Sequence, residues 1–162
     1  MFILSLRKKQ ILRRFFIIFA FAAVSAVIIS AAYCFAQEKK KYREFDGKKL
    51  CLEINNIQDA KDTAAFFGAD TSSASVSCES VRIPLNFNDI YIRYNEMQKD
   101  LGSDLENFKG RSCLKYSIKP AENGDAGVTY TLLVCDGRLI GGDISENDFD
   151  GSIRGLYRKD NK

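Results

Sequence analysis

The sequence predicts an α+β protein, in which a small antiparallel sheet is packed by two helices behind an N-terminal transmembrane helix. Three observations predict this class. An apolar run without any charged residue covers residues 15–36. Two segments in the middle of the chain repeat apolar residues at the three- and four-residue spacing of a helix. The last third of the chain alternates apolar and polar residues, which is typical of strands. The predicted order after the apolar run is α-β-α-β-β-β.

The first 36 residues predict a segment that inserts into a membrane. Residues 1–14 are a basic tail with five Lys or Arg residues and no acid, and residues 15–36 carry no charge. About 20 apolar residues in a helix are enough to cross a bilayer. We therefore expect residues 15–36 to be a single-pass anchor in the lipid bilayer of the cell membrane. A short basic tail usually stays inside, which places the domain outside.

A cleaved secretory signal is the alternative for the same segment. Cys34 and Ala36 place small side chains at the −3 and −1 positions of a cut before Gln37. A cut near Ala36 predicts a secreted soluble factor instead of a tethered one. In either case the charged residues 37–49 predict a linker, and residues 50–158 predict one small α+β domain.

Two helices and a strand are expected in the first half of that domain. Asn56 is a suitable N-cap for a helix over residues 57–67, which Gly68 would end. Residues 76–83 favour a strand that stops at Pro84. A second helix, capped by Asn86 or Asn88, places these residues on one face: Phe87, Ile90, Tyr91, Tyr94, Met97, Gln98 and Leu101.

The last third of the domain predicts a hairpin followed by one more strand. Residues 112–119 and 128–135 flank a turn-rich segment, PAENGDAG. A register centred on Gly124 opposes three apolar pairs and so predicts a core on one face of the hairpin. These pairs are Leu114 with Val134, Tyr116 with Leu132, and Ile118 with Tyr130. Asp136-Gly137 is a two-residue turn signal, and residues 138–144 are the third predicted strand.

Composition argues against several classes of function. The chain has no histidine, so it cannot form a Ser-His or Cys-His nucleophile pair within itself. Beyond residue 36 the chain carries 19 basic and 21 acidic residues, which argues against a nucleic-acid-binding domain. No motif indicates a cofactor, and we expect none.

The cysteines offer one candidate crosslink. Cys113 and Cys135 oppose each other in the hairpin register, which predicts a disulfide if the domain lies outside the cell. Two reduced, partly buried thiols are the alternative. The spacing of the domain cysteines excludes a CxxC zinc or redox pair.

The acidic, glycine-rich segment Asp143–Asp150 is a weak candidate for metal binding or catalysis. Asp143, Ser145 and Asn147 alternate as calcium ligands do in an EF-hand loop. The pattern then requires glycine where Asp148 stands, so the match is broken. A solvated turn is the simpler interpretation, and no metal ligand is assigned.

Several short motifs resemble a known family. They are Tyr94-Asn95-x-x-Gln98-Lys99, Gly102, Asp104-Leu105, Gly110, Leu132-Leu133-Val134, Gly137 and Ile140-Gly141-Gly142-Asp143. Over residues 57–155 the chain resembles the DUF4830 domain, a family of small bacterial proteins, largely from Firmicutes, with an N-terminal hydrophobic segment. The resemblance implies a small domain outside the cytoplasm and supplies no catalytic residues.

These observations favour a non-enzymatic, membrane-tethered domain outside the cytoplasm. Such a domain would bind a partner protein, a peptide or a component of the cell envelope. The alternatives are an enzyme or metal-binding module that uses Asp143–Asp150, and a secreted factor released by cleavage near Ala36.

Overall fold

The computed structural model describes residues 23–34, 41–121, 127–146 and 152–157. The chain forms two compact units, Met1–Tyr42 and Arg43–Lys162. Residues 23–34 are helical with exposed side chains. Among the described residues, no helix combines the length and the apolar character needed to cross a membrane. Residues 15–22 and 35–36 of the expected anchor lie outside the described part, so the anchor stays a prediction.

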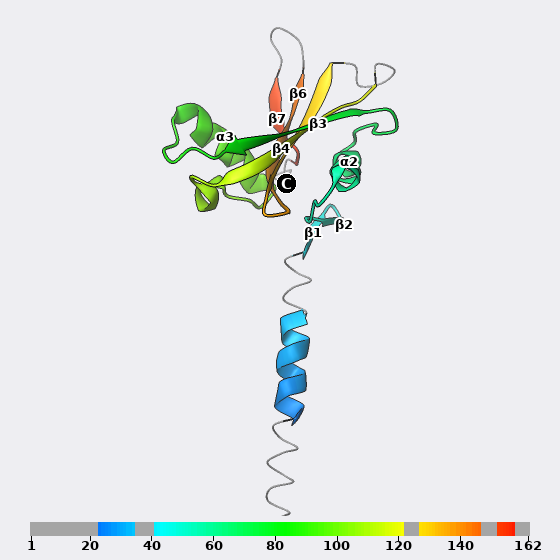
Figure 1. The fold of residues 1–162 in the computed structure, drawn as a ribbon, viewed down its shortest axis with the longest axis vertical. Coiled ribbons are helices and arrows are strands. Elements are labelled where there is room, and N and C mark those ends of the chain that lie inside the picture. Colours follow the sequence, from blue (N-terminus) through cyan, green and yellow to red (C-terminus); the bar gives the residue numbers. More distant parts are fainter. Residues whose placement is uncertain (1–22, 35–40, 122–126, 147–151, 158–162) are drawn as a thin grey trace, which may run out of the picture. The chain divides into compact units, whose positions relative to one another are not determined.

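The second unit is an α+β domain built around a five-stranded antiparallel sheet with strand order β3-β4-β5-β6-β7 (Figure 1). A separate two-stranded sheet, β1-β2, precedes it. The elements in chain order are β1 (Tyr42–Phe45), β2 (Lys48–Cys51), α2 (Ile57–Phe66), β3 (Ser75–Arg82), α3 (Asp89–Asp100), the 3-10 helix η1 (Leu105–Phe108), β4 (Ser112–Lys119), β5 (Val128–Cys135), β6 (Arg138–Glu146) and β7 (Ile153–Gly155). The predicted order from α2 to β6 is confirmed.

Asparagine caps begin both helices of the domain. The Asn56 side chain accepts a hydrogen bond from the Asp59 amide at 2.9 Å, and the Asn88 side chain accepts one from the Tyr91 amide at 2.9 Å. Each cap satisfies an amide that the first helical turn leaves without a partner. Of the two candidates for the second cap, Asn88 is the one used.

The predicted hairpin register is confirmed. Leu114 pairs with Val134, Tyr116 with Leu132, and Ile118 with Tyr130. Tyr116 and Ile118 are buried, but Leu114 is 42% exposed.

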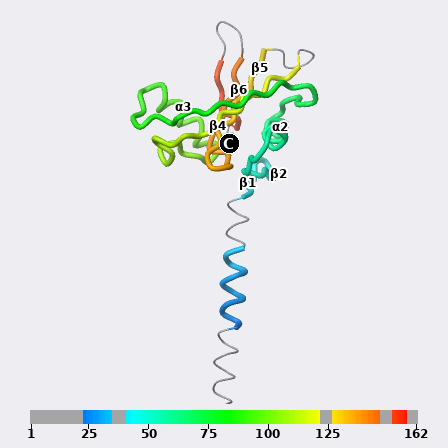
Figure 2. The backbone as a smooth tube through the Cα atoms, in the orientation of Figure 1, coloured from blue at the N-terminus to red at the C-terminus, as the bar shows by residue number. Residues whose placement is uncertain are grey.

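The expected face of the hairpin is core, but the opposite face of the sheet is covered as well. One apolar cluster contains Leu132 and Val134 of β5 with Ala60 and Ala64 of α2. The other contains Leu133 and Cys135, with Tyr91 and Tyr94 of α3 packed against it. Alternate residues of a strand point to opposite faces, so α2 and α3 lie on opposite sides of the sheet, as Figures 1 and 2 show. We call these sides the α2 face and the α3 face.

Part of the expected linker forms the β1-β2 hairpin instead. Its turn is Asp46-Gly47, with φ angles of 48° and 78°. Two consecutive residues with positive φ are typical of the tight turn that Asp-Gly favours. Phe45 is buried, and its ring contacts those of Phe66 and Phe67 at centroid distances of 6.0 and 5.8 Å. The hairpin thus adds to the core on the α2 face.

Candidate functional site

A network of polar groups joins α3 to the sheet. The Tyr94 hydroxyl donates a hydrogen bond to Asp143 Oδ1 at 2.7 Å. The Gly142 amide donates to Gln98 Oε1 at 2.8 Å, and Gln98 Nε2 donates to the Tyr94 carbonyl at 3.2 Å. Gln98 is completely buried. A Cβ atom on Gly141 would lie 2.9 Å from Gln98 Oε1, so glycine allows this close approach.

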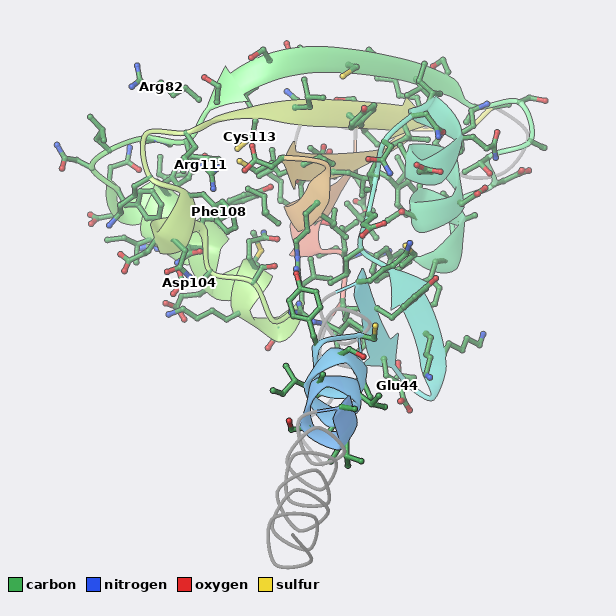
Figure 3. The ribbon with its side chains drawn as sticks, turned by 60° about the horizontal axis from the view of Figure 1, so that its bottom comes forward. Glu44, Arg82, Asp104, Phe108, Arg111 and Cys113 are labelled. Atoms are coloured by element: carbon green, nitrogen blue, oxygen red, sulfur yellow. The ribbon has the colours of Figure 1, made fainter. Side chains whose placement is uncertain are left out.

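A second arm of the network fixes the segment after α3. Asn95 Nδ2 donates to Asp104 Oδ1 at 2.9 Å, and Asn95 Oδ1 accepts from the Leu105 amide at 2.7 Å. The hydrogen bond from Asn95, followed by that from the Glu106 amide, lowers the pKa of Asp104. Asp104 is the N-cap of η1, which ends at Phe108, and both residues are labelled in Figure 3. The motif residue Asn95 is therefore a brace between α3 and η1.

Gly110 has a different local role. Its φ angle is 76°, a conformation that strains residues with a side chain. A Cβ atom at this position would also meet the side chain of Leu85. The Gly110 amide donates to the Ile83 carbonyl at 2.9 Å, which links the chain before β4 to the end of β3.

Burial controls the electrostatics of the pair formed by Tyr94 and Asp143. Asp143 is only 8% exposed, and this burial raises the pKa of its carboxyl group. Hydrogen bonds from Tyr94 and Thr131 and the charge of Lys115 oppose that rise. The pKa of Tyr94 is also raised, first by burial and then by the adjacent carboxylate. Tyr94 is therefore a neutral donor, and the carboxylate is held by two hydroxyl groups.

A groove of about 390 Å³ opens beside this pair on the α3 face. Its lining residues come from α3 and from four neighbouring strands: Val81, Ile90, Tyr91, Tyr94, Lys115, Thr131, Leu133 and Asp143. Ile90 is 77% exposed, so a large apolar side chain stands open to solvent at the groove. Lys115 Nζ lies 2.5 Å from Glu79 Oε1, which neutralises its charge. A mostly apolar concave surface with a few fixed polar groups suits the binding of a ligand.

A second hollow of about 510 Å³ lies between α3 and β7 and is lined by Met97, Asp100, Ile153, Arg154, Gly155 and Tyr157. Its charged residues Asp100 and Arg154 are both exposed. Its described lining residues include no buried polar pair comparable to Tyr94 and Asp143. We therefore take the groove beside α3 as the candidate site.

The structure brings together several of the residues that the family-like motifs singled out. Tyr94, Gln98, Gly141, Gly142 and Asp143 form one network, and Asn95 extends it. Sequence reasoning missed the groove itself. It placed Ile90 with the other residues on one face of its helix, and it gave no role to Lys115 or Thr131. The apolar run Leu132-Leu133-Val134 was the available signal, because strands with both faces covered have such runs.

Cys113 and Cys135 are both buried on the α3 face and are free thiols in this structure. Burial, followed by interaction with Cys135, raises the pKa of the Cys113 thiol to about 12. The Cys135 thiol donates a weak hydrogen bond to the Ser112 carbonyl at 3.8 Å. Their juxtaposition is as expected, and a disulfide between them stays a prediction.

The acidic segment Asp143–Asp150 is only partly described. Asp143 and Ser145 lie in β6, where they pair with β5 and with β7. Residues 147–150 lie outside the described residues. Within the described part of the chain, no group of three His, Cys, Asp or Glu residues is arranged to hold a metal ion.

Comparison with protein families, with curated proteins and with solved structures finds no match to this chain.

Proposed function

We propose that this chain is a non-enzymatic, membrane-tethered binding module outside the cytoplasm, and that its partner occupies the groove beside α3. The observation that carries the proposal is an open, mostly apolar groove next to a buried and fully bonded polar pair. The Asp143 carboxylate already accepts bonds from Tyr94 and Thr131, so it shapes the groove and does not stand ready as a base. Fixed polar groups of this kind orient a ligand against apolar walls.

The tether and the compartment rest on the sequence. Residues 15–36 are uncharged and long enough to span a bilayer, and a basic tail precedes them. Membership of the DUF4830 family stays a prediction. The family's N-terminal hydrophobic segment agrees with a membrane-tethered domain outside the cytoplasm. Among the motif residues that suggested the family, Tyr94, Leu133 and Asp143 line the groove, which supports a role for these three in shaping it.

Photocrosslinking tests the binding proposal. A photoreactive phenylalanine analogue replaces Ile90 in the full chain, which is then irradiated in the membranes of the cells that produce it. We expect a discrete adduct, because Ile90 is exposed and lines the groove. Ile92 is the matched control, since it lies on the same helix, is 47% exposed and does not line the groove. Absence of an adduct at Ile90, or equal adducts at both positions, contradicts the proposal.

Thiol labelling tests the compartment. Cys78 is exposed on β3 and should react with a membrane-impermeant maleimide on intact cells if the domain lies outside. Labelling of Cys78 only after lysis would place the domain in the cytoplasm. A mature N-terminus at Gln37 would instead support the secreted alternative.

The same sample tests the predicted disulfide. In denatured protein, labelling of Cys113 and Cys135 only after reduction would confirm the bond. Labelling of both thiols without reductant would contradict it.

A further inference from the structure

Strand β3 is a long and unprotected edge of the sheet. It has eight residues and pairs with β4 through an uninterrupted register; among the described residues, no strand lies on its other side. The opposite edge strand, β7, has three residues. Natural proteins usually blunt an edge with proline, lysine, a bulge or a short strand. The sequence of β3, SVSCESVR, contains neither proline nor lysine. Its charged residues are engaged within the domain, since Glu79 pairs with Lys115 and the Arg82 guanidinium donates to the Gly110 carbonyl.

The pairing of β3 with β4 shows which backbone amide and carbonyl groups of β3 point away from β4. Just beyond β3, the Ile83 amide donates to the Arg111 carbonyl and thus points toward the chain leading into β4. Along an antiparallel strand this orientation alternates from one residue to the next. The residues that direct their amide and carbonyl groups away from β4 are therefore Val76, Cys78, Ser80 and Arg82.

The edge borders the candidate groove. Val81 of β3 lines the groove, and Glu79 of β3 pairs with Lys115, which also lines it. Successive side chains of a strand alternate between the two faces of a sheet. A strand added beside β3 would therefore place every second side chain on the α3 face, next to Val81 and Ile90.

We propose that the ligand of this groove is an extended peptide segment of another protein, which adds to β3 as a sixth strand and places apolar side chains along the α3 face. The inference rests on the proposed function and names the chemical class of its partner. A row of unpaired amide and carbonyl groups is satisfied best by an extended polypeptide, and pockets for alternate side chains then select its sequence. Glu79 and Lys115 pair with each other at this border, and the neighbouring Val81 and Ile90 favour an apolar side chain of the peptide.

A second copy of this chain fits the edge less well. Symmetric antiparallel pairing of the outward groups of two β3 strands can centre on Cys78, which places Ser75 opposite Val81. Centring on Glu79 instead opposes two carboxylates, and centring on Ser80 places Glu79 opposite Val81. Centring on Val81 opposes two valines but pairs only residues 80–82 of each strand. Like charges directly opposite each other destabilise a sheet, and a serine brings no apolar side chain to the groove. A partner with apolar residues at alternate positions suits the site better.

A random dodecapeptide display library is the probe, selected against the full chain in lipid nanodiscs. We expect the enriched peptides to share alternating apolar positions. Binding of the best peptide is then measured by fluorescence anisotropy for the wild type, for Ser80→Pro and for Ser80→Ala. Proline removes the outward amide of Ser80, and an edge strand tolerates proline where that amide faces solvent. We expect Ser80→Pro to weaken binding by about tenfold or more and Ser80→Ala by less than about twofold.

Several results would overturn the inference. One is a peptide that Ser80→Pro binds as tightly as the wild type but that Ile90→Ser no longer binds. In that case the groove still binds a ligand, so the proposed function stands while strand addition fails. An enriched set without alternating apolar positions also contradicts strand addition. Dimerisation that Ser80→Pro abolishes would assign the edge to a second copy instead.

If circular dichroism shows that Ser80→Pro does not fold, a second measurement on the wild type tests the proposal. Amide hydrogen exchange of the wild type is compared with and without the peptide. We expect the amides of Cys78 and Ser80 to gain protection, because they would donate to the added strand. Unchanged exchange at both amides would overturn the proposal.

Discussion

The two faces of the sheet are covered in different ways. On the α2 face, apolar side chains meet: Leu132 and Val134 of β5 pack with Ala60 and Ala64 of α2. On the α3 face, polar side chains are buried as well, and Gln98, Asn95 and Asp143 are 0%, 4% and 8% exposed. Apolar burial is non-directional, whereas a buried polar group needs a partner in a defined place. The α2 face thus closes the core, and the α3 face fixes the position of one helix.

This difference explains why the groove lies on the α3 face. The bonds of Gln98 and Tyr94 hold α3 against β6 at two points. Nearer to the N-terminus of the helix, Ile90 is left exposed above the sheet. A helix held by directional bonds can leave a hollow beside it without shifting to fill it. Substitutions on the two faces should therefore have different consequences for stability and for binding.

The largest expected effect is on the α2 face. Leu132 is completely buried, so Leu132→Ala removes apolar contacts and leaves a cavity. We expect it to lower the free energy of unfolding by about 3 kcal/mol, as measured by urea denaturation. The matched control is Leu114→Ala in the same hairpin, where the side chain is 42% exposed and the loss should be about 1 kcal/mol or less. Equal losses at the two positions would contradict a closed core on this face.

A smaller effect is expected when the polar network is broken. Gln98→Leu keeps a side chain of similar size but leaves the Gly142 amide without its acceptor. An unsatisfied buried group costs about 1–3 kcal/mol, so we expect a loss of about 2 kcal/mol. Glu96→Leu places the same residue at an exposed position of α3 and should change stability by no more than about 0.5 kcal/mol. If Gln98→Leu is neutral, then apolar packing alone positions α3.

Much of the α2 face could be predicted from the sequence. The pairing of Tyr116 with Leu132 followed from apolar alternation, because a shift of one residue would turn every apolar side chain to the other face. The Asp136-Gly137 turn signal located β6 correctly. The same signal at Asp46-Gly47 also marks a hairpin, but the surrounding charges in KKKYREFDGKK favoured a linker. That assignment was wrong because Phe45, between the charged residues Glu44 and Asp46, is buried.

The α3 face could not be predicted in the same way. Its network joins residues that are far apart in the chain, such as Tyr94 with Asp143 and Gln98 with Gly142. Periodicity places Tyr94 on a helix and Asp143 on a strand, but it does not say which face of the sheet the helix covers. The family-like motifs did single out these residues without indicating their contacts. Lys115 and Thr131 carried no signal, because polar residues at alternate strand positions usually face solvent.

The smallest expected effect is the pH dependence of stability, which should have opposite signs for Asp143 and Asp104. Burial raises the pKa of Asp143 above its ordinary value of 3.8, so the folded protein binds this proton more readily than the unfolded chain does. The contribution of Asp143 to stability is therefore most favourable at low pH. It falls as pH rises from 3.8 through the raised pKa of the folded protein. Asp143→Asn still accepts a bond from Tyr94 but does not titrate. We expect the wild type to lose stability relative to this variant as pH rises from 3.8 through the raised pKa of Asp143.

Asp104 provides a control of opposite sign. Hydrogen bonds from Asn95 and from the Glu106 amide lower its pKa below 3.8, so its contribution is present above that value and is lost as pH falls through the lowered pKa. Relative to Asp104→Asn, the wild type should therefore gain stability as pH rises, and it should do so in a lower pH range than the Asp143 effect. Urea denaturation of the three proteins from about pH 2.5 to 7 checks both trends. A rise in stability with pH for the wild type relative to Asp143→Asn would contradict the prediction and show that the hydrogen bonds from Tyr94 and Thr131, together with the charge of Lys115, outweigh burial in setting the pKa of Asp143.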